Sequence, residues 1–248
     1  MANNLGNNNN STIAPWMSEL SAWADVFDIS ADTLPQAKGE LLDKERRWLD
    51  NIAVSTLYAL KKDNYSLTEF AFFIISDDWD EQSLISLKDN TGASLLFGLQ
   101  TTNHCISNLD VADSIICCKP DEVQQVMKVF EVLSNRRNDL TTIDFNIVKE
   151  TLQHTEPAQF IQSTKMGRDR LNRMKQAIAE TLSQIPENIS ISFLILRVKT
   201  YGDLSLDEFS VIESAIYNQF DDSISFWCAP IRIDELDCCW IEAIYGVE

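Results

Sequence analysis

The stretch from Lys119 to Asn138 constrains the fold of this chain more than any other. It opens with Pro120 and Asp121, which suit a first helical turn because proline is tolerated there and a carboxylate can accept hydrogen bonds from free N–H groups. Apolar residues then recur at helical spacing, at Val123, Val126, Met127, Phe130 and Leu133. Val129 and Val132 add apolar surface beside this stripe, which predicts a long helix covered on more than one side. An ordinary amphipathic helix in a single α/β domain would show the same periodicity.

Short apolar runs precede this helix and have the composition of buried strands. They span Glu69–Ser76, Ala93–Gln100 and Ser114–Cys118. A short helical pattern over Gln82–Asn90 separates the first two runs. Strands that alternate with helices predict a parallel sheet covered on both faces. We therefore interpret residues 66–138 as an α/β half that ends in the long helix.

The chain from residue 139 onward follows a different pattern. Strand-like runs cover Leu140–Phe145, Ser190–Thr200, Ser223–Arg232 and Cys238–Gly246. Helical periodicity marks Gly167–Ile185 and Leu206–Phe220. Long strands separated by helices, with the last two strands expected to form a closing hairpin, predict an α+β domain over residues 139–248.

The N-terminal part looks helical after an Asn-rich tail. Residues 1–12 are polar and predicted to be disordered, and residues 13–65 are predicted to form a helical segment. In Thr12–Phe27 the apolar residues share one helical face that includes Trp16 and Trp23, and a second helix is expected over Leu41–Lys61. Two tryptophans on a short helix indicate docking onto the body of the protein, with binding to a partner as the alternative.

The charge balance disfavours two classes of partner. The chain has 20 Lys and Arg residues against 38 Asp and Glu residues, and the net charge of −18 argues against nucleic acid and anionic membranes. No apolar run approaches the roughly 18 residues of a membrane-spanning helix, and the N-terminus lacks the features of a secretory signal. None of the six cysteines lies in a CxxC motif, so we expect reduced thiols, no metal site and a cytoplasmic location.

Patterns for nucleotide binding or catalysis are missing where they would be expected. A phosphate-binding turn after a strand needs neighbouring glycines, but the seven glycines of this chain are scattered. The turn after Glu69–Ser76 instead carries Asp77, Asp78, Asp80 and Glu81, which would repel a triphosphate. A divalent-metal site is one interpretation of these carboxylates, and a solvated acidic loop is the other. With no G-x-S-x-G motif and only two histidines, we predict no catalytic residue and no cofactor.

From about residue 69 onward, local motifs and their order resemble FtsZ, the bacterial relative of tubulin. Asp113–Ile116 (DSII) resembles the family's DSLIV strand before the central helix, and Gly167–Arg170 (GRDR) resembles its GEDRA motif. Gly202–Glu208 (GDLSLDE) resembles the G.DLTL.E turn into a helix, and Ile244–Gly246 (IYG) stands where the family has IATG. The resemblance implies a tubulin/FtsZ-like α/β fold: a parallel Rossmann-like sheet truncated in its N-terminal part, a long central helix and an α+β C-terminal domain.

The sequence departs from the family at both places where FtsZ-like proteins handle GTP. The family's GGGTGTG loop corresponds here to Asp77–Glu81 (DDWDE). The family's N.DF.D loop enters the next subunit and promotes hydrolysis there, and it corresponds to Thr142–Ile147 in this chain. Asp144 matches the first carboxylate of that loop, whereas Ile147 replaces the second. The resemblance therefore implies the scaffold without the enzyme, which predicts a pseudo-GTPase.

We expect a non-catalytic interaction module whose partner is a protein, with FtsZ or a related filament subunit as the first candidate. The residues predicted to form the interface are Asp144, Phe145, Asn146, Ile147, Arg168, Arg170, Trp16 and Trp23. Docked on a filament, such a subunit could cap it and slow its turnover. The alternative is a structural or adaptor protein that reuses the fold for an unrelated partner. A metal-dependent nucleotide hydrolase using Asp77, Asp78 and Asp80 is a third hypothesis, and homo-oligomer formation is compatible with each of the three.

Overall fold

A computed structural model divides the chain into two compact units, Met1–Asn51 and Ile52–Glu248. The structure describes residues 53–60, 65–75, 79–102, 109–134, 145–153, 157–220 and 224–247, all of which belong to the second unit. The predicted disordered tail and the predicted helix with Trp16 and Trp23 lie outside the described residues.

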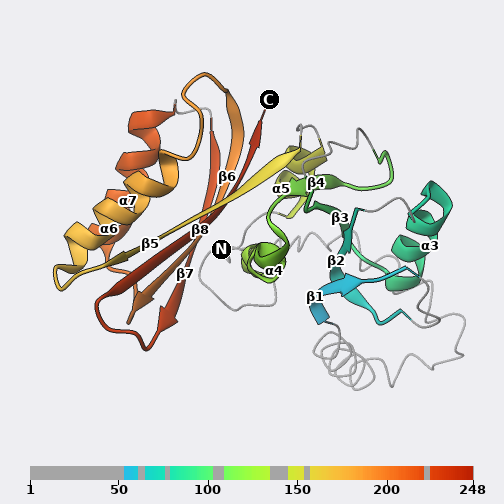
Figure 1. Cartoon of the computed structure of the whole chain (residues 1–248), viewed down its shortest axis with the longest axis horizontal. Coiled ribbons are helices and arrows are strands. Elements are labelled where there is room, and N and C mark those ends of the chain that lie inside the picture. Colours follow the sequence, from blue (N-terminus) through green and yellow to red (C-terminus); the bar gives the residue numbers. More distant parts are fainter. Residues whose placement is uncertain are drawn as a thin grey trace, which may run out of the picture. The chain divides into compact units, whose positions relative to one another are not determined.

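Within the described part of the chain, eight strands form one mixed sheet in the order β1-β2-β3-β4-β5-β8-β6-β7 (Figure 1). The strands are β1 (Ala53–Tyr58), β2 (Thr68–Ile74), β3 (Leu95–Gln100), β4 (Ser114–Cys117), β5 (Ala158–Met166), β6 (Ile191–Tyr201), β7 (Ser225–Ile233) and β8 (Cys238–Val247). Strands β1 to β5 pair in parallel in their order along the chain. Strand β8 is antiparallel to both β5 and β6, and β7 is parallel to β6 at the far edge.

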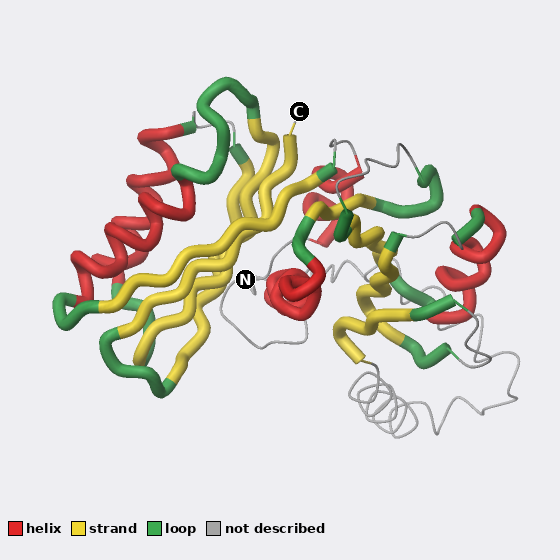
Figure 2. Tube along the Cα trace, in the orientation of Figure 1, coloured by secondary structure: helices red, strands yellow, loops and turns green. Residues whose placement is uncertain are grey.

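The helices join these strands (Figure 2). They are α3 (Glu81–Thr91), α4 (Val123–Phe130), α5 (Phe145–Gln153), α6 (Arg170–Leu182) and α7 (Leu206–Gln219). Short 3-10 turns, Pro120–Glu122 and Glu131–Leu133, extend α4 at its two ends. Helices α6 and α7 lie along one face of the C-terminal strands in Figure 1. No helix among the described residues is long and apolar enough to cross a membrane.

A single hydrophobic cluster connects the parallel strands, α4 and the C-terminal strands. Phe97 of β3 packs on Phe130 of α4, with ring centroids 4.2 Å apart. The same cluster contains Phe193 of β6 and Ile244 of β8. Helix α4 therefore shares one core with strands that precede it in the chain and with strands that follow it. Side chains that alternate to the other face of β6 and β8 form a separate cluster with α6 and α7.

The predicted strands around α3, and most C-terminal elements, agree with the structure to within a few residues at each end. The prediction of one helix over residues 119–138 is wrong at its C-terminal end, because helical structure stops at Leu133 and Ser134 is extended. After Leu133 no apolar residue continues the stripe through Asn138, and Ser and Asn side chains compete for the backbone hydrogen bonds of a helix. Residues 135–144 lie outside the described part of the chain.

Two further segments have the opposite secondary structure to the prediction. Residues 53–58 were expected to end the helix Leu41–Lys61 but form strand β1, which pairs in parallel with β2. A short apolar run is ambiguous by periodicity, and here the pairing with β2 decides it. The run Leu140–Phe145 was expected to be extended, but Phe145 instead begins α5. Val148 and Leu152 are buried one turn apart in the main cluster, which explains the helix.

The predicted closing hairpin is also wrong, because β7 and β8 do not pair. Strand β8 lies between β5 and β6, with Ile241 and Ala243 fully buried. Strand β7 is at the edge and contains Pro230, which has no N–H to donate and is therefore tolerated at an edge. Strand β5 was not predicted, because its polar residues alternate with apolar ones and weaken the apolar run.

Candidate protein-interaction site

The resemblance to FtsZ implies that the family's phosphate-binding loop corresponds to the residues between β2 and α3. Asp80 is the N-cap of α3, and its carboxylate Oδ1 accepts a hydrogen bond from the backbone N–H of Ser83 across 2.7 Å. This hydrogen bond from Ser83 holds the pKa of Asp80 below its ordinary value. The preceding Trp79 is buried and packs on Phe73, with ring centroids 5.3 Å apart. A carboxylate and a buried indole therefore occupy the entry to this helix.

The charge at the N-terminus of α3 disfavours a bound phosphate. Phosphates bind at helix N-termini because free N–H groups and the helix dipole favour negative charge there. At α3 the Asp80 carboxylate already supplies a negative charge and takes one of the N–H groups. Asp77 and Asp78 lie outside the described residues, so their predicted role as metal ligands is not addressed by the structure. Among the described residues no group of three His, Cys, Asp or Glu side chains could hold a metal ion.

The predicted interface loop leads into α5. Asp144 lies outside the described residues, as do the side chains of Phe145 and Asn146, whose backbones form the first turn of α5. Ile147 in the same turn is 52% exposed, whereas Val148 and Leu152 are buried in the main cluster. Ile147 is therefore not a core residue. It places a large aliphatic side chain at the surface beside the segment of Asp144.

The two predicted arginines have different environments. Arg168 lies exposed in the turn between β5 and α6. Arg170, in the first turn of α6, donates from Nε to Oε1 of Glu208 across 2.5 Å, and a guanidinium N–H also contacts the backbone carbonyl of Asp203. Arg170 thus holds two parts of the chain together, which makes an intramolecular role its first function. Helix α5 precedes β5 (Ala158–Met166), whereas the two arginines follow the other end of that strand, so the nine-residue strand separates them from Ile147 along the chain.

Glu208 is the centre of this junction. It is almost fully buried, and its Oε2 accepts hydrogen bonds from the backbone N–H and the hydroxyl of Ser205, which completes a capping box at α7. Burial is the largest single influence and raises the pKa of Glu208, but the hydrogen bonds from Arg170 and Ser205 outweigh it. The pKa of Glu208 is therefore below its ordinary value. A buried carboxylate that stays charged in this way stabilises the turn rather than acting as an acid or base.

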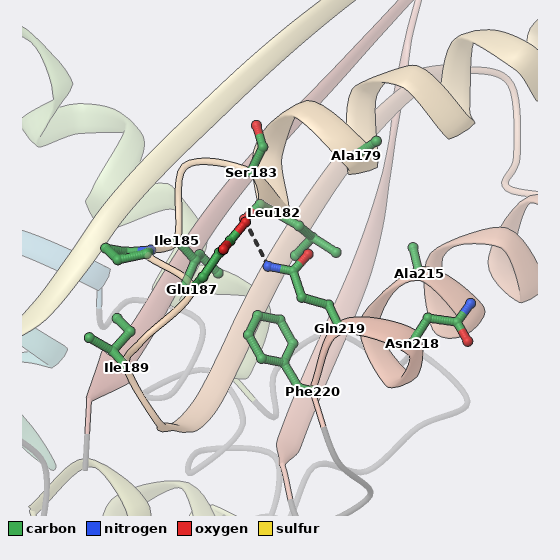
Figure 3. A pocket seen from close by; sticks show the side chains of 11 residues that line it. Ala179, Leu182, Ser183, Ile185, Glu187, Ile189, Ala215, Asn218, Gln219 and Phe220 are labelled. Atoms are coloured by element: carbon green, nitrogen blue, oxygen red, sulfur yellow. Dashed lines mark hydrogen bonds between the residues drawn. The ribbon is translucent and has the colours of Figure 1, made fainter.

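Figure 3 shows a pocket between the C-terminal ends of α6 and α7, with a volume of about 580 Å³. Leu182, Ile185 and Phe220 contribute its apolar surface, and the side-chain amide of Gln219 crosses it to donate to the carbonyl of Leu182. Glu187 is the one charged residue among those that line it. Ser183 also lines the pocket, but its hydroxyl donates to the backbone carbonyl of Glu180, and no residue among those that line the pocket could act as its base except Glu187.

Several exposed apolar residues at the far end of the C-terminal strands were not predicted from the sequence. They include Met166 at the end of β5 and Trp240 in β8. The exposure of Trp240 could have been inferred from the sequence, because it lies between Cys239 and Ile241, which both point to the buried face of β8. The five described cysteines are free thiols.

Solved structures of FtsZ and CetZ proteins resemble this one. An FtsZ W319Y mutant from M. jannaschii superposes with a TM-score of 0.54 at 13% identity, over 73% of this chain and 65% of that chain. CetZ2 from Haloferax volcanii, as a GTPγS-bound protofilament, superposes with a TM-score of 0.51 at 10% identity, over 74% of this chain and 67% of that chain. CetZ from Methanosaeta thermophila superposes with a TM-score of 0.50 at 12% identity, over 76% of this chain and 63% of that chain.

The protein therefore has a tubulin-like fold, and the solved structures that show it are FtsZ and CetZ proteins. This confirms the tubulin/FtsZ-like α/β fold that the sequence motifs implied. The match spans 65% of the length of the M. jannaschii FtsZ, so the likeness concerns the fold and not the activity of that whole protein. No family model matches the chain, and no curated protein matches it.

Proposed function

We propose that this chain is a non-catalytic FtsZ-like protein that binds a filament subunit of the FtsZ type and caps or regulates its filaments. The observation that carries this proposal is the Asp80 carboxylate at the N-terminus of α3, in the place of a phosphate-binding turn. A subunit that lacks a nucleotide face cannot form the nucleotide-dependent contact on that side. Growth of a filament would therefore stop at such a subunit.

The α5 region supports the second contact that a filament subunit makes, the one through the family's loop that enters the neighbouring subunit. Asp144 matches a carboxylate of the family's loop that enters the neighbouring subunit, and Ile147 adds an exposed aliphatic side chain in the first turn of α5. Exposed large apolar side chains beside charged ones are typical of protein contacts. A contact face retained in part at Asp144 and a second one that is lost form the arrangement that a capping subunit needs.

Sedimentation of FtsZ polymers tests this proposal. Purified FtsZ with GTP would be pelleted with and without this protein at ratios well below one to one. Capping predicts a loss of pelleted polymer that far exceeds the added protein. Asp144→Arg and Ile147→Glu should each restore the pellet, whereas Ile85→Glu, a change at an exposed isoleucine of α3, should not.

Two results would contradict the proposal. An unchanged pellet without co-sedimentation of this protein would remove the filament role and leave the adaptor hypothesis. Saturable binding of a fluorescent GTP analogue, or GTP hydrolysis by the purified chain, would show that the nucleotide face is functional despite Asp80.

A further inference from the structure

The face of strands β5, β8, β6 and β7 that lies opposite α6 and α7 is covered along only part of its length. Near β4 it is buried in the main cluster, where Phe160, Ile195 and Ile244 stand in neighbouring register positions. Farther along the same strands the same face opens to solvent. Met166 is 70% exposed, Tyr201 43% and Trp240 40%.

The register places these residues close together. Met166 is opposite Cys238 and two positions from Trp240 along the pairing of β5 with β8. Trp240 is opposite Lys199 of β6, which is two residues before Tyr201. The turn between β7 and β8 adds Leu236, which is 65% exposed, and the N–H of Gly167 donates to the carbonyl of Asp237 beside it. We call Met166, Tyr201, Leu236 and Trp240 the distal patch.

Acidic residues neighbour the members of the distal patch along the chain, and one of them, Asp237, pairs with Arg173 across 3.8 Å. Exposed carboxylates stand next to it at Asp203, Asp234, Glu235 and Asp237. The exposed bases at this end of the sheet are Arg168 and Arg232. Lys199 lies over the ring of Trp240, 5.4 Å from its centroid, but it also pairs with the buried carboxylate of Glu242. The rim therefore has an excess of negative charge.

We propose that the distal patch binds a basic amphipathic segment of a partner protein, with apolar side chains on the patch and Lys or Arg at its rim. A large apolar patch with a charged rim is typical of a protein-binding surface. Opposite charge on the partner would steer it to this end of the sheet. The proposal is independent of the filament role, since the distal patch does not include the α5 region.

Charge also argues against the two other occupants available. Residues 1–37 contain no Lys or Arg, and the predicted helix with Trp16 and Trp23 carries Glu19 and Asp25. Docking that segment here would bring like charges together. A second copy of the chain, at a net charge of −18, would do the same.

Fluorescence anisotropy with two labelled, tryptophan-free peptides tests the proposal on the full chain. Both peptides form amphipathic helices with a leucine face, one with lysines and the other with glutamates on the polar face. We expect saturable binding of the lysine peptide alone, weakened by added salt. Leu236→Ser and Trp240→Ser should each raise its Kd about tenfold, as expected for central contacts of an interface. Ile85→Ser, at an exposed isoleucine of α3, is the matched control and should leave the Kd unchanged.

Several outcomes would overturn the proposal. These are equal binding of both peptides, no binding of either, or an equal loss of affinity in the Ile85→Ser variant. Dimers of the chain that dissociate on Leu236→Ser would assign the patch to a second copy. Tighter peptide binding by the Trp16→Ser/Trp23→Ser variant would assign it to the chain's own N-terminal segment. All the patch substitutions are at exposed positions, and an unchanged thermal midpoint would confirm that each variant is folded.

Discussion

Arg170 of α6 and Glu208 of α7 form a charged hydrogen bond 2.5 Å long between the first turns of two helices. The pair also joins the two motifs that carried much of the resemblance to FtsZ, Gly167–Arg170 and Gly202–Glu208. Gly202 itself has a φ of 72°, a backbone conformation that favours glycine, and Arg170 packs beside it. These motifs therefore specify a structural junction between the first turns of α6 and α7.

Substitution Arg170→Leu should destabilise the protein. It leaves the buried carboxylate of Glu208 without its charged partner, and loss of such a hydrogen bond costs about 2 kcal/mol. For a domain of this size we expect a fall of roughly 4–8 °C in the thermal midpoint. The exposed Arg168→Leu is the control and should change the midpoint little. A double variant Arg170→Leu/Glu208→Gln should lose less than the sum of the single variants, because the stranded charge is removed.

Stability should fall as the pH is lowered through the acidic range. Glu208 has a folded pKa below its ordinary value of 4.5 because its hydrogen bonds outweigh the effect of burial, and Glu122, held by Lys119 and Gln162, has the same direction of shift. A lowered folded pKa contributes stability that is present above about pH 4.5 and is lost as the pH falls through the folded value. Urea unfolding across this range should show the decrease. In Glu208→Gln the decrease should be shallower, and an equally steep curve would contradict the assignment.

Two thiols, the buried Cys239 and the partly buried Cys228, should react slowly with alkylating reagents. Burial raises the pKa of Cys228 and of Cys239 to about 12, so at pH 8 each holds about a thousandfold less thiolate than an ordinary cysteine. Cys228 has no cysteine next to it in the sequence, and its labelling by iodoacetamide can be followed separately by mass spectrometry. We expect fast labelling only after unfolding in urea. Comparable rates in the folded and unfolded chain would contradict this.

Local patterns predicted most elements of the fold but not their neighbours in the sheet. The apolar run of β2, and the caps of α3 at Asp80 and Gly92, are short-range signals that determine their own structure. The position of β8 between β5 and β6 depends instead on pairing across long stretches of chain. Strand β1 was missed for the same reason, since its partner β2 decides its structure.

The candidate site could likewise be predicted from the sequence only in part. The acidic turn containing Asp80 was visible as a departure from the family motif, because the missing glycines are a property of the sequence. The capping hydrogen bond to Ser83 required the start of α3 to be known. The distal patch could not be predicted, because Met166, Leu236 and Trp240 come from separate strands and a turn that only the sheet brings together.

Gly246→Ala should destabilise the protein by about 2 kcal/mol, as is usual for an overpacked core. Gly246 is opposite Phe193 in the pairing of β8 with β6, and a Cβ added to it would overlap the ring of Phe193. Phe193 is fully buried in the main cluster and cannot move aside without disturbing its neighbours, which include Trp227 with ring centroids 6.5 Å apart. Because the clash involves one ring, Phe193→Leu should relieve it. The double variant Gly246→Ala/Phe193→Leu should therefore lose less unfolding free energy, measured in urea, than the sum of the losses of the two single variants. Additive losses would show that the cost of Gly246→Ala does not come from the ring of Phe193.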